Sequence, residues 1–480
     1  MKINKSPWIH QLDQTRSIER LASDIKTDFT IVGAGIAGMA TAFFLLKYTT
    51  KNVVIVEKSR VARGATGHNA GQVVSYFERP FNELVEEFGL KMACEGQKSI
   101  EMAWKLLDEI YTEAGLTIPF SRFTGYDGFV TYDQVIAHLR TNVLRVQGGL
   151  PVQELLISDS AKFTATLPAE YAALYKVVPH AEILTLLETA QNDFVAISLH
   201  QKGVVNSALF TECIATFLKE RYGTGGVAAG AAARFSLFEE TKISKIVLKD
   251  RDAILDAGNH TITTDRVILC TNGFENLDII NKYGLDIDKK FHHLVNGVVG
   301  RMSGYVERMN KPPMAISYYV NPEPGAPGAS DGSGTFDNMS DPYFYLTRRE
   351  YEYEKGKKDH SLICLGGPQH DIPDREEYLY EFDYPEEVQA ELDHFVHKIY
   401  DFEPNKKIEY QFTWHGLMGY TPNKVRLIGE EPKNRILLYN LGCNGVGILP
   451  SLYGARRIAT LLVSAESGEK VEPTMFDPKG

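Results

Sequence analysis

The sequence is poor in cysteine, and its few cysteines form no recognisable group. Among 480 residues there are five, and they stand singly at positions 94, 213, 270, 364 and 443. Their spacing contains no CxxC and no metal-ligand pattern, which argues against a metal site and against a disulfide framework. An odd, dispersed set is typical of a reducing compartment with buried thiols. We therefore expect a cytoplasmic protein that binds no metal.

Long apolar runs and an excess of basic residues are also missing. The opening stretch MKINKSPWIHQLDQTRS has no apolar core of the kind found in secretory signals, and no run of apolar residues is long enough to span a membrane. The formal net charge is -11, from 51 Lys and Arg against 62 Asp and Glu. Nucleic-acid binding relies on clustered Lys and Arg, so this balance disfavours a nucleic-acid partner. We expect a small-molecule substrate and no membrane partner, and the oligomeric state stays open.

What the sequence does contain is a strand, a turn and a helix followed by a second strand near the N-terminus. In DFTIVGAGIAGMATAFFLLKY, the pattern predicts a strand at 29–32 and an apolar helix that runs to about residue 48. NVVIVEK, at 52–58, predicts another buried strand. Two strands joined by a helix within about 30 residues indicate a parallel sheet.

The glycines of GAGIAG have positions that suit a dinucleotide. Gly33 permits a tight turn, Gly35 lets the backbone approach a pyrophosphate, and Gly38 lets the helix pack on the strand. Glu57 ends the second strand 19 residues after Gly38, where a carboxylate accepts ribose hydroxyls. The alternative is a glycine-rich turn next to a surface glutamate. The combination favours a dinucleotide site.

The segment VARGATGHNAGQVVS, at 61–75, is unusually rich in small residues around His68. Such a segment packs poorly as core, but it lets the backbone lie close to a flat or charged group. Because it comes directly after Glu57, we expect this segment to run alongside the remaining part of a long cofactor.

Together, GAGIAG, Glu57 and GATGHNAGQ resemble the D-amino-acid oxidase superfamily of FAD-dependent amine and amino-acid oxidoreductases. WHGLMGYTPNKVRLIGE, at 414–430, is similar to the family's W-x-G-x-x-x-x-T-P-D-x-x-P-x-I-G, and 438–462 is similar to its closing glycine segment and helix. Weaker internal blocks follow in the expected order, so the resemblance spans about 28–465. Asn423 departs from the usual aspartate, and the Pro/Gly/Ser-rich stretch 321–338 looks like an inserted loop.

The resemblance implies an α/β fold in which a Rossmann-like FAD-binding domain is interleaved with a mainly antiparallel-sheet substrate domain. We expect the FAD domain to comprise 28–80, 200–280 and 410–465, and the substrate domain 81–199 and 281–409. An N-terminal extension (1–27) and a C-terminal tail (466–480) complete the chain.

The resemblance also implies which residues contact FAD: the fingerprint, the ribose carboxylate, the small-residue segment, the internal blocks and the closing loop. They are Gly33, Ala34, Gly35, Ile36, Ala37, Gly38, Glu57, Lys58, Gly64, Ala65, Thr66, His68, Asn69, Ala70, Gly71, Gln72, Ile243, Thr271, Asn272, Gly273, Trp414, Gly416, Gly442, Asn444, Gly445, Val446, Gly447 and Ile448. The helix that starts near Ser451 would direct its N-terminus at the flavin and stabilise the negative charge of the reduced ring. The alternative is a glycine-rich turn that packs on the sheet.

His68 stands where one branch of the family has arginine and non-covalent flavin, and where another has a histidine bonded to the flavin. Its neighbours Gly67 and Asn69 are those of the first branch. A non-covalent FAD contact is favoured, and a covalent link is the alternative.

For catalysis the resemblance implies His415, Tyr345 and Arg348, with Arg348 pairing a substrate carboxylate. His415 would be a wall residue of the active site. The plain alternatives are a sheet-face residue for Tyr345 and an exposed arginine for Arg348. The implied reaction is oxidation of a C–N bond in a small amine or amino acid to an imine that hydrolyses. A tRNA-nucleoside-modifying flavoenzyme and a flavin-binding subunit of a larger complex are the alternatives. The sequence leaves open which amine is oxidised and whether the enzyme is an oxidase or a dehydrogenase.

Overall fold

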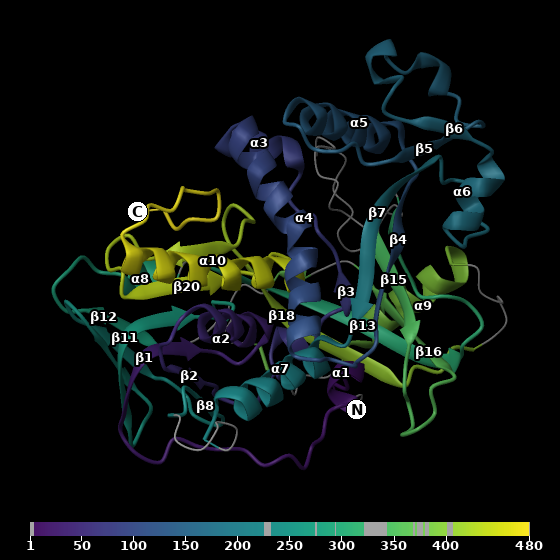
Figure 1. Cartoon of the computed structure of the whole chain (residues 1–480). Helices are drawn as coiled ribbons and strands as arrows, with labels where there is room; N and C mark the ends of the chain where they lie inside the picture. Colours follow the sequence, from purple (N-terminus) through teal and green to yellow (C-terminus); the bar gives the residue numbers. More distant parts are fainter. Residues whose placement is uncertain are drawn as a thin grey trace.

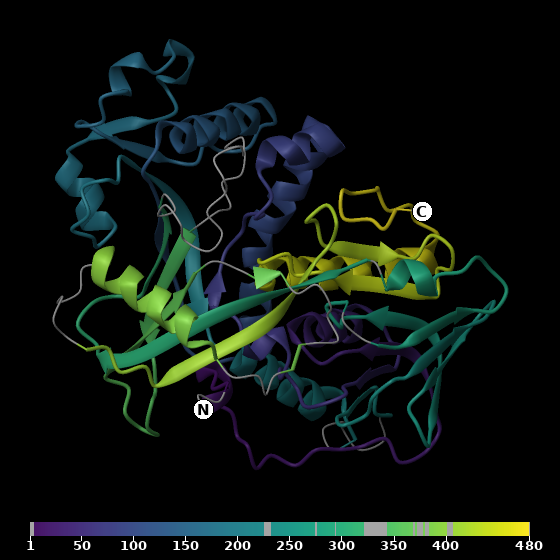
Figure 2. The same ribbon diagram turned by 180° about the vertical axis from the view of Figure 1, so that it is seen from behind.

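Two β-sheets lie side by side in the computed structural model of this chain, and helices cover them (Figure 1). Figure 2 shows the same two sheets from behind. The structure describes residues 4–224, 232–273, 276–292, 294–320, 343–367, 370–371, 378–379, 384–400 and 407–479. The predicted inserted loop, 321–338, lies outside the described residues.

The first sheet holds the strand–helix–strand unit that the sequence predicts. Its order is β12-β9-β10-β11-β1-β2-β8, with β20 beside β11 and β19 beside β20; its centre is parallel. The strands are β1 (Ile25–Val32), β2 (Val53–Val56), β8 (Phe235–Phe238), β9 (Lys245–Leu248), β10 (Ala253–Asp256), β11 (Thr261–Leu269), β12 (Asp278–Asn281), β19 (Leu427–Glu430) and β20 (Leu437–Leu441).

The second sheet is mainly antiparallel. Its order is β17-β13-β16-β15-β14-β4-β7-β5-β6, with β18 beside β13 and β3 beside β7. The strands are β3 (Gln72–Val73), β4 (Phe120–Phe129), β5 (Leu155–Ser158), β6 (Lys176–Val178), β7 (Ala196–Val205), β13 (Asn296–Arg308), β14 (Met314–Tyr319), β15 (Tyr343–Glu350), β16 (His360–Gly366), β17 (His370–Asp371) and β18 (Phe412–Tyr420). The predicted fold class is confirmed.

Helices cover both sheets. They are α1 (Pro7–His10), α2 (Ile36–Tyr48), α3 (Phe81–Phe88), α4 (Leu90–Glu113), α5 (Tyr132–Gln147), α6 (His180–Leu186), α7 (Ser207–Tyr222), α8 (Asp288–Phe291), α9 (Glu386–Lys398) and α10 (Ile448–Ser467), with short 3-10 turns η1 (Ala65–Gly67), η2 (Thr164–Thr166) and η3 (Ala169–Tyr171). α2 is buried from Ile36 to Leu46 because it packs against α7 and α10 as well as the first sheet. In the described part of the chain, no helix is both long enough and apolar enough to cross a membrane.

The sheet pairing corrects two of the expected boundaries. β7 was expected to be divided at residue 200, yet the whole strand pairs with β4 in the second sheet. β18 was expected in the FAD domain, yet it pairs with β13 from Asn296 to Gly304. Gly89 separates α3 from α4, because its φ of 78° leaves the helical region. The chain therefore crosses between the sheets more often than its motifs indicate.

Candidate functional site

A cavity of about 1120 Å³ lies between the two sheets. Gly33, Glu57 and Cys270 follow β1, β2 and β11 directly, and all three line it. Ligands of parallel α/β sheets bind at this carboxyl edge. The opposite wall comes from the second sheet and includes Ser317 and Tyr345. The volume exceeds the roughly 300–1,000 Å³ of ordinary small-molecule pockets, which suits a long cofactor together with a substrate.

The glycine fingerprint forms the narrow turn that the sequence predicts. Gly33 has a φ of 105°, and a Cβ there would lie 2.7 Å from the Cys270 carbonyl oxygen. A Cβ on Gly38 would overlap the carbonyl of Gly33. Gly35 instead lines the cavity, and a Cβ there would lie 3.0 Å from the Thr66 hydroxyl. Two of the glycines therefore close the turn, while Gly35 leaves room for a ligand.

Glu57 is held in place by the backbone around it. Its Oε2 accepts a hydrogen bond from Ala34 N (2.8 Å) and its Oε1 accepts one from Ser59 N (2.9 Å). The side chain also lines the cavity. The backbone thus fixes a carboxylate at this edge of the cavity.

The small-residue segment is fixed by side chains of its own. Thr66 Oγ1 accepts from Ile36 N (3.0 Å) at the start of α2. The Asn69 amide donates to the Ala65 and Thr66 carbonyls (3.1 and 3.0 Å) and to Ser207 Oγ (2.9 Å). The segment therefore presents a rigid backbone wall to the cavity.

His68 projects from this wall into the cavity lining. Its Nδ1 lies 3.0 Å from the Gly64 carbonyl oxygen. A carbonyl only accepts, so Nδ1 carries the proton in the neutral ring and Nε2 does not. Burial lowers the pKa of His68 to about 4. The imidazole is therefore neutral at pH 7, in a single tautomer.

The closing glycine loop brings the start of α10 to the cavity. Gly445, Gly447 and Ile448 line it, and the N-cap Gly447 provides no side-chain cap for the first N–H groups. These groups and the helix dipole suit negative charge. Asn444 supports the loop from behind, since its Oδ1 accepts from Thr421 N (2.8 Å).

The three predicted catalytic residues lie in different environments. Tyr345 lines the cavity. His415 is 3% exposed, is absent from the described lining, and contacts the Tyr378 hydroxyl through Nδ1 (2.8 Å). It lies behind the wall, since it is Tyr378 that reaches the cavity.

Arg348 requires a correction. Its guanidinium forms two hydrogen bonds to the Glu188 carboxylate (2.8 and 3.0 Å), and its Nε donates to the Pro312 carbonyl (2.9 Å). The side chain is 1% exposed and lies outside the described lining. Strand alternation explains the difference, because Arg348 and Tyr345 are an odd number of residues apart and face opposite sides of β15. We do not retain it as a carboxylate-binding residue.

Most predicted cofactor residues meet at the cavity. Those that line it are Gly33, Gly35, Ile36, Ala37, Glu57, Lys58, Gly64, Ala65, Thr66, His68, Asn69, Ala70, Gln72, Ile243, Thr271, Asn272, Gly416, Gly445, Val446, Gly447 and Ile448. The others are absent from the described lining; they are Ala34, Gly38, Gly71, Gly273, Trp414, Gly442 and Asn444.

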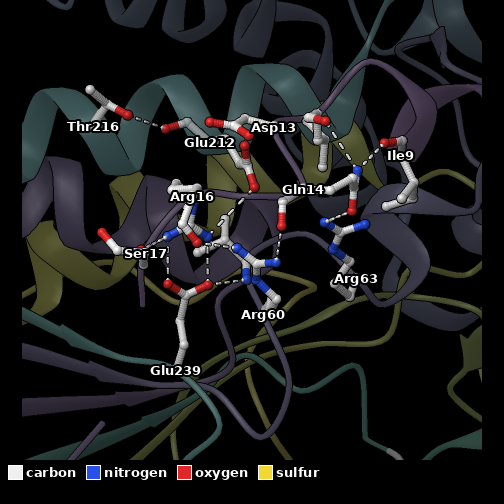
Figure 3. A network of polar contacts seen from close by, with 12 residues as sticks. Ile9, Asp13, Gln14, Arg16, Ser17, Arg60, Arg63, Glu212, Thr216 and Glu239 are labelled. Carbon is white, nitrogen blue, oxygen red and sulfur yellow. Dashed lines mark hydrogen bonds and ion pairs between the residues drawn. The ribbon is translucent and has the colours of Figure 1, made fainter. Parts of the chain in front are cut away.

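The N-terminal extension is part of the site, which the sequence did not reveal. Its residues in the lining are Asn4, Lys5, Ser6, Ile9, His10 and Gln14. Figure 3 shows how the next residues are held: Arg16 pairs with the buried Glu239 (2.6 and 2.7 Å), and Arg60 donates to the Gln14 and Arg16 carbonyls (3.0 and 2.7 Å). The one signal for this was Trp8, an isolated large aromatic residue in a polar stretch.

Other cavity residues that the motifs missed come mostly from the second sheet and the segment after β3. They include Val74, Tyr76, Glu78, Gly300, Met302, Ser317, Tyr378, Leu379, Leu417 and Met418. Val74, Leu417 and Met418 lie within quoted motifs but at positions to which the motifs assign no role, and the others lie outside every motif.

Comparison with known proteins gives a family match over most of the chain. A family model described as DAO, FAD dependent oxidoreductase, matches residues 28–461. The fold is similar to that of glycine oxidase from Geobacillus kaustophilus (17% identity, TM-score 0.59, 93% of this chain and 96% of that chain). It is also similar to L-proline dehydrogenase from P. horikoshii (15% identity, TM-score 0.63, 95% and 97%). At these identities the two structures show the fold alone.

Curated relatives match over a short segment. One is the putative Rieske 2Fe-2S iron-sulfur protein YhfW of Bacillus subtilis, 35% identical over 77 residues, or 16% of this chain and 15% of that protein. Another is the gamma-glutamylputrescine oxidoreductase of Escherichia coli, 32% identical over 75 residues, or 16% and 17%. The match thus spans less than a fifth of either relative.

Proposed function

The chain belongs to the DAO family of FAD-dependent oxidoreductases, and from this premise we propose that it binds FAD and oxidises a C–N bond of a small amine or amino acid. The observation that carries the proposal is a single cavity that joins the Glu57 carboxylate at one end to Ser317 and Tyr345 at the other. A dinucleotide bound along the first end would leave the second end for a substrate.

The residues at the first end suit FAD. Gly35 leaves space for a pyrophosphate at the start of α2, and the fixed Glu57 carboxylate suits the ribose hydroxyls. The uncapped N–H groups of α10 suit a ring that becomes negatively charged on reduction. Bound there, FAD supplies the two-electron acceptor for the hydride that leaves the carbon next to the substrate nitrogen.

The chain itself holds the substrate and restricts the access of water to the second end of the cavity. Tyr345, Met302 and Tyr378 line the second end with large side chains, and Ser317 adds a hydroxyl. The product imine then hydrolyses in water. Support also comes from the names of similar proteins, glycine oxidase, L-proline dehydrogenase and gamma-glutamylputrescine oxidoreductase, which refer to amino acids and an amine.

The deciding experiment uses the purified protein without oxygen. We expect it to be yellow, and we expect at least one of a panel of amines and amino acids to bleach the flavin absorbance. A colourless protein that FAD cannot reconstitute contradicts FAD binding. A yellow protein that no compound in a broad panel bleaches contradicts the proposed reaction.

The same preparation determines how the flavin is held. The neutral His68 ring can contact FAD with or without a bond. After acid precipitation, colour in the supernatant indicates free FAD and colour in the pellet indicates a covalent link. We expect the supernatant to be yellow.

A further inference from the structure

We infer that Ser317 binds an oxygen atom of the substrate, and that the buried Lys202 ammonium is the positioning residue that directs the Ser317 hydroxyl into the cavity as a hydrogen-bond donor. This inference rests on the proposed amine oxidation and names a feature of its substrate, a carbonyl or carboxylate oxygen in addition to the amino group. Four observations on the second sheet support it.

The first observation is where Lys202 and Ser317 lie. Lys202 belongs to β7 and is fully buried, and Ser317 belongs to β14 and lines the second end of the cavity. Ser317 is the register partner of Asp127 on β4 and of Tyr345 on β15. Paired residues of neighbouring strands project to the same face of a sheet. These side chains therefore share the face that borders the cavity.

The second observation is that every hydrogen of the Lys202 ammonium has an acceptor. Its Nζ donates to Asp127 Oδ1 (2.6 Å), to Ser317 Oγ (3.2 Å) and to the Tyr126 carbonyl oxygen (3.3 Å). An ammonium has three N–H donors and no acceptor, so these three bonds use all of them. Although burial alone would raise the pKa of Asp127, the Lys202 charge holds it well below its usual range. Asp127 is therefore an anion, and the buried pair keeps both charges.

The third observation is the direction of the Ser317 hydroxyl. Because its oxygen accepts a hydrogen bond from an ammonium, its own proton must point away from Lys202. In the described part of the chain, the bond from Lys202 is the one hydrogen bond of this side chain. A hydroxyl that accepts from a charged donor is polarised and becomes a stronger donor itself. The O–H of Ser317 therefore suits an acceptor atom in the cavity, and a second cation at the same oxygen is disfavoured.

The fourth observation is that the fold is built around this ion pair. A Cβ on Gly125 of β4 would overlap Lys202 Cδ, so the missing side chain lets the lysine cross the sheet face. His200 Nε2 lies 2.9 Å from Asp127 Oδ2 and holds the other carboxylate oxygen. A buried ion pair adds little net stability, because the desolvation of the charges offsets their attraction. Of the three hydrogen-bond partners of Lys202, Ser317 is the one in the described lining, and the pair acts on the cavity through it.

This arrangement takes the place of the guanidinium that the sequence led us to expect. Arg348 is held by Glu188 and lies outside the described lining. Ser317 is a neutral donor backed by an ion pair whose charges cancel, so it selects its ligand by hydrogen bonding rather than by net charge. An amide carbonyl and a carboxylate both accept from it, whereas an alkylamine without oxygen would bury the donor unsatisfied, which opposes binding. The substrate is therefore an amine that carries such an oxygen.

The test begins with binding to the FAD-loaded protein. Sodium acetate and acetamide are titrated separately while the flavin spectrum is followed, with sodium chloride to match the ionic strength. We expect at least one of them to perturb the spectrum; acetate alone indicates a carboxylate, and acetamide alone a neutral carbonyl. Ser317→Ala should weaken the effect by about tenfold, and Ser317→Thr, which keeps the hydroxyl, should retain most of it.

The matched control is Ser361→Ala. It removes a buried serine of β16 that is absent from the described lining, and it should behave as the wild type. If neither compound perturbs the spectrum, or if Ser317→Ala binds them as tightly as the wild type, the inference is overturned.

A double-mutant cycle tests the role of Lys202. Lys202→Met is combined with Asp127→Asn, so that no unpaired charge is left in the sheet; Lys202→Met with Asp127→Leu, an apolar pair, replaces it if the first combination does not fold. We expect the combined change to weaken probe binding by about threefold or more, because the hydroxyl is then free to turn away, and to have no further effect once Ser317 is alanine. Equal losses in both backgrounds contradict the positioning role.

Turnover provides the second measurement. For the panel compound that bleaches the flavin fastest, Ser317→Ala should raise KM by about tenfold and lower kcat by less than about threefold, and Ser317→Thr should restore KM. A purely structural defect would not divide in this way between KM and kcat. A fastest substrate without a carbonyl or carboxylate oxygen, or an unchanged KM in Ser317→Ala, contradicts the inference.

The inference and the proposed function fail in different ways. If the panel bleaches the flavin but Ser317→Ala alters neither probe binding nor KM, amine oxidation stands and the Ser317 assignment is wrong. If acetate or acetamide binds through Ser317 but nothing bleaches the flavin, the donor site stands and the proposed reaction is wrong.

Discussion

The indole nitrogens of Trp8 and Trp414 donate hydrogen bonds to the same acceptor, the carbonyl oxygen of Asn69 (2.5 and 3.2 Å). The two rings meet edge to face with centroids 6.3 Å apart, and both are fully buried. Trp8 comes from the N-terminal extension and Trp414 from β18, so three distant segments meet at one carbonyl. The backbone wall next to His68 is therefore held from two sides.

The first prediction concerns Trp8. Trp8→Ala should lower the free energy of unfolding by about 3–5 kcal/mol, because it empties a large buried site. It should also weaken FAD retention, because the Asn69 carbonyl loses one clamp. Trp8→Phe keeps much of the packing and loses only the N–H donor, so its effect should be smaller. Urea unfolding and FAD titration of each variant measure the two effects. If Trp8→Ala binds FAD as tightly as the wild type, the Trp8 hydrogen bond to Asn69 contributes to stability alone.

Substitutions at two glycines of GAGIAG should affect different properties, stability at Gly38 and cofactor binding at Gly35. Gly38→Ala places a Cβ against the Gly33 carbonyl, so the turn must shift and the apoprotein should be less stable by more than about 2 kcal/mol. Gly35→Val meets only the Thr66 hydroxyl and the cavity, so the apoprotein should melt near the wild-type temperature but fail to retain FAD. Melting curves and flavin content of both variants provide the comparison. Normal FAD content in Gly35→Val would refute the pyrophosphate assignment.

Glu57 is predicted to bind the cofactor through its charge. Glu57→Ala should weaken FAD binding by about 10–100-fold, since the ribose loses a charged acceptor, while Glu57→Gln should lose less because an acceptor oxygen remains. Glu240→Ala, an exposed glutamate paired with Arg20, is the matched control and should leave FAD affinity unchanged. Flavin fluorescence during titration of the apoproteins reports the dissociation constants. If Glu57→Ala and Glu240→Ala bind FAD alike, the ribose lies elsewhere.

The Arg348–Glu188 pair should matter for stability and not for the substrate. Arg348→Met leaves Glu188 with Lys311 as its remaining cation, at 2.8 Å, so we expect a loss of roughly 2–4 kcal/mol. Adding Glu188→Gln should recover part of that loss. In every variant that folds, KM should stay within about twofold of the wild type. A large rise in KM with unchanged stability would restore Arg348 as a substrate residue.

Local signals predicted one end of the site well. The turn at Gly33, the carboxylate of Glu57 and the small-residue segment lie within a short stretch, and all three line the cavity as their spacing predicts.

The other end depends on contacts between distant segments. The Asn4 amide meets the His415 backbone across 411 positions, and Arg348 meets Glu188 across 160. Contacts between residues so far apart in sequence produce no local pattern, so the sequence could not predict either of them. Glu78 lacks a motif for the same reason, since Tyr420 and Gly445 reach it from remote strands and loops.

The last prediction concerns His138, a histidine on α5 that is 3% exposed. Burial, followed by the neighbouring His200, lowers its pKa to about 3, although Asp127 nearby acts in the opposite direction. Its Nε2 has no hydrogen-bond partner among the described residues. The folded protein therefore resists protonation of this ring, while the unfolded chain takes up a proton near pH 6.5.

Between these two pKa values the unfolded state binds more protons, so stability should fall as the pH decreases from about 6.5 towards 3. At pH 5 the contribution is about 2 kcal/mol relative to pH 8. His138→Gln cannot titrate, so the wild type should lose about that much more stability than the variant over this interval. Urea unfolding of both at pH 8 and pH 5 measures the difference, with the exposed His397→Gln as control. Parallel losses in wild type and His138→Gln would mean that the folded protein accommodates the charged ring.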